Sequence, residues 1–152
     1  MHIIPDSLET FLQSYPPDVR KLFGATRDSI LDLEKNVYEM IWDNYNALAV
    51  AYAPADQLRD AYCHIAVYSA HVNLGFNQGA HLSDPNKMLV GEGALIRHIK
   101  IGSAEILESK AVRKLIYEAR SWSKKMNPWG ALPTGTVSIV KSISENRRRP
   151  KF

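Results

Sequence analysis

The stretch HVNLGFNQGAHLSDPNKMLVGEGALIRHIKI, residues 71–101, decides the fold. An apolar alternation, in which Val72, Leu74 and Phe76 share one face, runs into a polar, glycine-rich loop. A second alternation, ALIRHIKI, follows that loop. The pattern predicts two strands joined by a long connection over residues 77–94, with the alternating apolar side chains facing a core.

The chain before this stretch also favours strands. VYEMIWDNY (37–45) and ALAVAYAP (47–54) are rich in strand-forming residues. In the second segment large apolar residues alternate with alanines, which suggests that something covers the alanine face closely. CHIAVYSAHVNLGF (63–76) predicts either two strands that turn near Ser69-Ala70-His71 or one long bent strand.

Helical periodicity appears at both ends of the strand-rich region. A first helix is expected to begin near Asp6 or Ser7, either of which can cap it. The proline pair before Asp18 opens a second helix that runs toward Asn36. A third helix has Ser109 as its N-cap and an apolar stripe at i, i+3, i+4 and i+7, which Trp122 extends: Val112, Leu115, Ile116 and Ala119.

This order predicts an α+β, two-layer domain. Strands that follow one another through short connections favour an antiparallel sheet, here of about five strands, with the N-terminal helix pair and the C-terminal helix on one face. The domain is expected to span residues 1–125. Residues 126–152 form a basic extension rich in proline and glycine, which is expected to be partly disordered. Within it, residues 134–144 can form a last strand or dock on a partner.

Charge and composition restrict the partners. From Ser123 onward the chain has seven basic residues and one acid, which gives this segment a net charge of +6. The whole chain has a net charge of +3, so the remaining residues carry −3 and the body is mildly acidic. The basic balance is therefore no sign that the body binds nucleic acid. If nucleic acid or an acidic partner is bound, the sequence points to the tail residues Arg147, Arg148, Arg149 and Lys151.

The cellular compartment is inferred from the number of cysteines and from the length of the apolar runs. The single cysteine, Cys63, excludes an intrachain disulfide and fits a reducing compartment. No signal peptide is recognisable, and no apolar run approaches the ~18 residues of a membrane span. We expect a cytoplasmic protein that does not contact a membrane. The oligomeric state is left open, and a dimer is compatible with the sequence.

No catalytic signature is present. A nucleophile elbow, a phosphate-binding P-loop and a dinucleotide fingerprint are all missing, so whether the chain is an enzyme is left open. None of the five histidines has the i, i+4 spacing of a helical metal pair, although His64 and His98 share the outer sheet face in some registers. Asp28 and Asp32 stand at i, i+4, but neighbouring Arg27 and Lys35 favour a solvated helix face over a cation site.

The 77–94 loop is the best candidate for a ligand site. Much of it is explained by turn chemistry, since Asp84-Pro85-Asn86 starts a turn and the glycines allow sharp bends. The functional alternative is a small cleft in which the loop and nearby strand residues gather polar groups beside an aromatic wall. The candidate ligand-binding residues are Trp42, Asn73, Asn77, Asp84, Arg97 and His98.

Arg97 separates these two alternatives. An arginine just inside the returning strand needs a partner if it is buried. An ion pair with Asp84 or Glu92 would make it a structural clamp, which is the reading we favour. An unpaired Arg97 in an open cleft would instead be an anion site.

The stretch also resembles a known family. VNLGF, the GAHLSDPNKMLVGEG loop, RHIKI and the helix AVRKLIYEA occur in the order seen in the YdhG-like family, domain of unknown function 1801. The resemblance covers about residues 15–120. It implies an α+β fold, frataxin-like in some members, and one branch described as an iron chaperone. Iron is a cofactor or cargo by this resemblance alone.

Two functions follow as expectations. The first is a binding or accessory domain for a small metabolite or a metal. The alternative is an interaction module whose basic tail contacts nucleic acid or an acidic partner.

Overall fold

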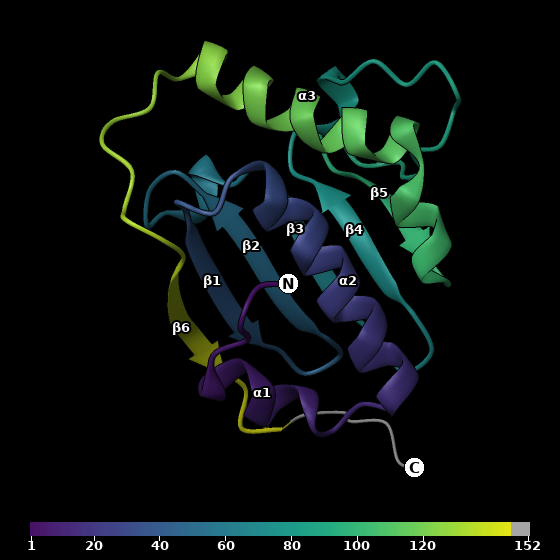
Figure 1. Ribbon diagram of the computed structural model, residues 1–152, viewed down its shortest axis with the longest axis vertical. Coiled ribbons are helices and arrows are strands. Elements are labelled where there is room, and N and C mark those ends of the chain that lie inside the picture. The colour runs from purple at the N-terminus through teal and green to yellow at the C-terminus, as the bar shows by residue number, and fades with distance from the viewer. Residues whose placement is uncertain (147–152) are drawn as a thin grey trace.

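The structure, a computed structural model, describes residues 1–146. The tail residues Arg147, Arg148, Arg149 and Lys151 lie outside the described residues. Helices and strands form the two layers that the sequence predicts, and the α+β class is confirmed (Figure 1). The helices are α1 (Asp6–Leu12), α2 (Pro17–Leu33) and α3 (Lys110–Met126), and the strands are β1 (Tyr38–Asp43), β2 (Leu48–Ala53), β3 (Cys63–Val67), β4 (Val72–Phe76), β5 (Arg97–Ile101) and β6 (Val137–Ile143).

The sheet has six strands in the order β5-β4-β3-β2-β1-β6. Neighbours from β1 to β5 are antiparallel, as expected. The sheet of about five strands that was expected gains a sixth, β6, which pairs with β1 in parallel. The chain reaches that edge because the segment after α3 runs back along the molecule to lie beside β1 (Figure 1). Residues 137–143 of the predicted extension therefore belong to the sheet.

The region around residue 70 contains two strands rather than one bent strand. Tyr68 N donates to His71 O at 3.0 Å and closes the turn between β3 and β4. Because residues alternate between faces, Ile65 and Val67 of β3 are buried on the same side as Leu74 of β4.

The helices cover that side of the sheet. In Figure 1, α2 lies across its near face and α3 runs along one end. The apolar stripe of α3 is buried, and Ser109 Oγ accepts from Ala111 N at 3.2 Å, so the predicted cap is confirmed. At α1 the expected cap is wrong, because Pro5 precedes the helix and neither Asp6 nor Ser7 caps it.

The opposite face is covered only in part. The connection between β2 and β3, which contains the short 3₁₀ helix η1 (Leu58–Asp60), brings Ala61 against Met40, Ala51 and Ala53. This contact accounts for the small residues on the alanine face. No helix of residues 1–146 is both long enough and apolar enough to cross a membrane.

Candidate functional site

Three of the predicted site residues lie on the sheet face that the helices do not cover. Pairing places Trp42 beside Ala49, and Asn73 between Ala66 and Lys100. Two strands, β2 and β3, therefore separate Trp42 from Asn73, a spacing of about 14 Å for strands ~4.8 Å apart. Trp42 is too far away to serve as a wall for a ligand held by Asn73.

His64 and His98 do share this face, since both pair with Gly75. The His64 ring lies directly over Gly75, where a Cβ would come 2.0 Å from Nε2. His64 Nδ1 is 2.9 Å from Asn77 Oδ1. Burial lowers the pKa of His64, His98 adds to the lowering, and the bond to Asn77 opposes it. The predicted site residue Asn77 thus holds a neutral imidazole.

The expected ion pair between Arg97 and Asp84 is wrong. The Asp84 carboxylate accepts from the backbone N–H groups of Met88 and Leu89, at 2.8 and 2.9 Å. Arg97 Nη1 donates to the carbonyls of Gly93 and Ile96, at 2.6 and 2.8 Å. Neither Asp84 nor Glu92 pairs with it among the described residues. Arg97 therefore closes the loop through carbonyls that accept from its Nη1 and not through a carboxylate.

The 77–94 loop does border a cleft, but not at Arg97. A hollow of about 260 Å³, here called the loop cleft, lies between residues 83–88 and the first half of α3. Its two carboxylates are both engaged, because Asp84 caps the loop and Glu118 accepts from Ser83 N and Oγ at 2.6 and 2.9 Å. Lys110 and Lys114 remain, and both are exposed.

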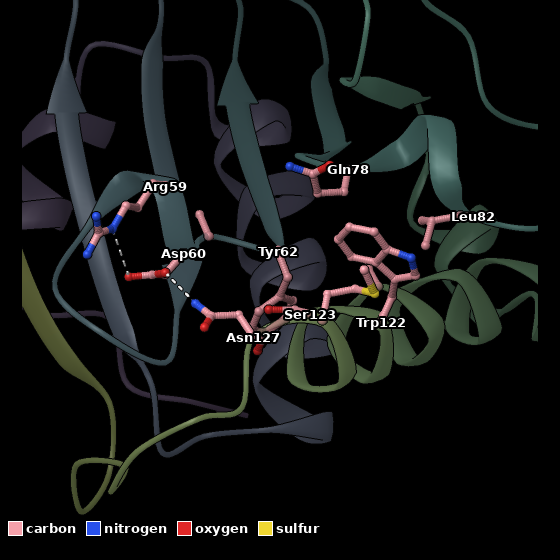
Figure 2. A pocket seen from close by; sticks show the side chains of 11 residues that line it. Arg59, Asp60, Tyr62, Gln78, Leu82, Trp122, Ser123 and Asn127 are labelled. Carbon is pink, nitrogen blue, oxygen red and sulfur yellow. Dashed lines mark hydrogen bonds and ion pairs between the residues drawn. The ribbon is translucent and has the colours of Figure 1, made fainter.

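A second hollow lies on the other side of the same loop segment (Figure 2). This hollow, the Trp122 pocket, has a volume of about 180 Å³ and forms where η1, the residues after β4 and the second half of α3 meet. Its principal residues are Asp60, Tyr62, Gln78, Leu82, Trp122 and Asn127.

The aromatic wall is held in place by the loop. His81, in the 3₁₀ helix η2 (Gly79–His81), stacks on the Trp122 indole with ring centroids 4.9 Å apart and planes 11° apart. Two residues further on, Ser83 is tied to Glu118 of α3. The two contacts fix the loop across α3 and separate the Trp122 pocket from the loop cleft.

The Tyr62 ring forms the floor of this pocket. Tyr62 is 3% exposed and stacks on Trp129, with centroids 5.7 Å apart. The Arg120 guanidinium lies 5.0 Å from the Trp129 ring centroid and pairs with Glu34 at 2.5 Å. Burial, together with Cys63, raises the pKa of the Tyr62 phenol well above its ordinary range, so the group stays neutral.

Polar groups stand at the end of the pocket opposite Trp122 (Figure 2). The Asp60 side chain is 14% exposed, and its Oδ1 accepts from Asn127 Nδ2 at 3.3 Å. Arg59 Nε lies 3.9 Å from Asp60 Oδ2, but the Arg59 side chain is 80% exposed. Gln78 borders the pocket, and no hydrogen bond joins its carboxamide to the described side chains. The arrangement is an aromatic surface facing a carboxylate and two carboxamides, which together can hold a small, flat, polar molecule.

Comparisons of the chain with protein-family models, curated proteins and solved structures return no match. The resemblance to the YdhG-like family therefore stays a prediction. Within residues 1–146, no three histidine, cysteine, aspartate or glutamate side chains lie close enough together to hold a metal ion.

Sequence reasoning missed this pocket. From the sequence, Trp122 is interpreted as an extension of the apolar stripe of the third helix. The segment that contains Asp60 and Tyr62 is interpreted as a connection between strands. Asp60 and Asn127 are 67 positions apart, so no spacing rule links them. The signal that the sequence does contain is a tryptophan and an asparagine, Trp122 and Asn127, near the charged C-terminal end of α3.

Proposed function

We propose that the protein is a small-molecule binding domain and that the Trp122 pocket is its binding site. The observation that carries this proposal is the placement of Trp122 opposite Asp60 and Asn127 in one recess with a buried aromatic floor (Figure 2). Apolar walls with a few convergent polar groups are typical of ligand sites. The loop cleft has no aromatic wall, and its carboxylates already bind the protein itself, which leaves the exposed Lys110 and Lys114.

The volume limits the ligand. A cavity of about 150 Å³ holds one benzene molecule. The Trp122 pocket, at about 180 Å³, therefore fits one substituted ring and excludes a nucleotide bound in full. A ligand of this size has about ten non-hydrogen atoms. If each contributes roughly 0.4–0.6 kcal/mol of binding free energy, the Kd lies between about 40 µM and 1 mM. Such a ligand is a metabolite present at high concentration, or a fragment of a larger molecule that projects from the pocket.

The three tryptophans supply the test. In an NMR spectrum their indole N–H signals report on the pocket wall (Trp122), the residue behind the floor (Trp129) and the uncovered sheet face (Trp42). We expect single-ring compounds such as benzamide and benzamidine, added at about 5 mM so as to exceed the expected Kd, to shift the Trp122 signal most. Trp42 should not respond.

A matched pair of variants completes the experiment. Trp122→Leu should abolish the response of Gln78 and Asn127 signals to the same compounds, whereas Trp42→Leu should leave it intact. If the compounds shift only the NMR signals of Lys110 and Lys114, the binding site is the loop cleft and not the Trp122 pocket. If no compound shifts the signals of the Trp122 pocket, the proposal fails.

A further inference from the structure

Resting on the proposed function, we infer that the Trp122 pocket selects a flat monocation: an amine, amidine or guanidine that carries N–H donors on a single ring. The inference concerns the charge of the ligand, which the shape and volume of the pocket leave open. It depends on Asp60.

Asp60 is a mostly buried carboxylate with few protein partners. Its side chain is 14% exposed, and an ionised carboxylate offers about four acceptor positions. Among residues 1–146 its side chain has one neutral hydrogen bond, at 3.3 Å from Asn127 Nδ2, and one long ion pair, at 3.9 Å from Arg59 Nε. A cationic N–H donor forms a stronger hydrogen bond to a carboxylate than a neutral donor does, so a ligand that carries one would add to the single amide hydrogen bond of Asp60.

Arg59 does not supply that donor. Its side chain is 80% exposed, and ion pairs at such exposure and distance contribute little. Figure 2 shows Arg59 on the far side of Asp60 from Trp122, so on the pocket side a ligand would share the carboxylate with Asn127 alone among the residues drawn. Arg59 also borders the pocket, but its exposed guanidinium lies on the far side of Asp60, where it competes weakly with a ligand for the carboxylate.

The other residues that line the pocket suit the same ligand. Trp122 gives an aromatic face, the best partner among side chains for a ring or a cation. Gln78 and Asn127 each have a carbonyl oxygen that can accept an N–H. A single ring on Trp122 with its charged group directed to Asp60 thus uses each of these polar groups. An anion would instead face the Asp60 carboxylate.

The test uses three probes of nearly equal size: benzamidine, which is a cation, benzamide, which is neutral, and benzoate, which is an anion. We expect benzamidine to bind the wild-type protein at least tenfold more tightly than benzamide, which corresponds to about 1.4 kcal/mol. Benzoate should bind weakest. Kd values come from titration of the Trp122 indole signal.

Variants isolate the charge. Asp60→Asn should abolish the preference, so that benzamidine and benzamide bind within about twofold of each other. Asp56→Asn is the control, since Asp56 lies on the same connection, pairs with Lys141 and does not border the pocket. Arg59→Gln should leave benzamidine binding equal or up to about fivefold tighter, because it removes the competitor.

The outcomes separate the two proposals. If none of the three probes binds in the Trp122 pocket, the proposed function itself fails. If benzamide or benzoate binds as tightly as benzamidine, the pocket is a ligand site but the inference about charge is overturned. The probe series on the wild-type protein decides this even if Asp60→Asn does not fold.

Discussion

Arg27 and Glu39 form a buried ion pair that joins α2 to β1. Arg27 Nε lies 2.7 Å from Glu39 Oε2, with side chains 2% and 0% exposed. The remaining lone pairs of Glu39 accept from Tyr52 Oη at 2.6 Å and Ser138 Oγ at 2.7 Å. Arg27 also donates to the carbonyls of His2 and Ile3, so one charge pair fixes the N-terminal segment, β2 and β6 together.

Glu39→Gln should lower the free energy of unfolding by about 3–5 kcal/mol, because it leaves the Arg27 charge buried and uncompensated. The double variant Arg27→Met, Glu39→Gln should lose less than Glu39→Gln alone, since no buried charge remains. Urea denaturation of the wild type, both single variants and the double variant measures this. A double variant whose loss equals the sum of the two single losses would show that the pair is not coupled.

Gly75→Ala should destabilise the protein by about 1–3 kcal/mol, because the added Cβ meets the His64 ring. The cost is specific to that ring. In a His64→Ala background the same change should be neutral or stabilising, since alanine suits a strand better than glycine does. A loss of equal size in both backgrounds would mean that the backbone, not His64, sets the requirement for glycine.

His64 should make stability depend on pH. Its pKa is lowered in the folded protein, chiefly by burial, from 6.5 in the unfolded chain. Below pH 6.5 the unfolded chain takes up a proton that the folded protein does not, so stability falls until the pH passes the folded-state pKa. One proton can give a slope of at most about 1.4 kcal/mol per pH unit.

Urea denaturation between about pH 5 and 8 tests this, with the window set by the ordinary histidine pKa. The slope below pH 6.5 should shrink in His64→Gln. His71, whose pKa is also lowered by burial, Lys100 and His98, should leave a smaller slope in that variant. An unchanged slope in His64→Gln would contradict the assignment.

Cys63 should be inert in the folded protein. It is fully buried, and burial raises the pKa of its thiol well above the ordinary value. A thiol reagent at pH 8 should label it only as fast as the protein unfolds, and at once in urea. Rapid labelling of the native protein would show that the sheet opens locally at β3.

Local patterns account for most of the fold but not for its long-range contacts. Alternation in β2, β3 and β4 correctly separates core from outer residues, because the period of a strand is local. The ion pair of Arg27 was not predictable, since it reads as one more charge on a solvated helix face. The pairing of β6 with β1 has no local signal either. The seven residues of β6 favour a strand, but they do not indicate which strand it pairs with.

The same limit applies to the site. The loop was expected to border a small cleft with Arg97 at its base, because a connection of that length must fold over the sheet; it does border a cleft, but Arg97 does not line that cleft. Arg97 was assigned a carboxylate partner, but within residues 1–146 its Nη1 donates to backbone carbonyls instead. The Trp122 pocket combines three distant segments, and their meeting follows from packing alone.

The position of β6 also shapes how the protein is made. Glu39 and Ser138 are hydrogen-bonded neighbours but lie 99 positions apart, so β6 is synthesised after every other strand of the sheet. On the ribosome the nascent domain therefore passes through a stage in which β1 is an unpaired edge, with apolar Met40 and Ile41 beside a carboxylate that lacks one donor. Pairing at such separation is slow relative to pairing between neighbouring strands, so β1 is the edge of the sheet that is closed last.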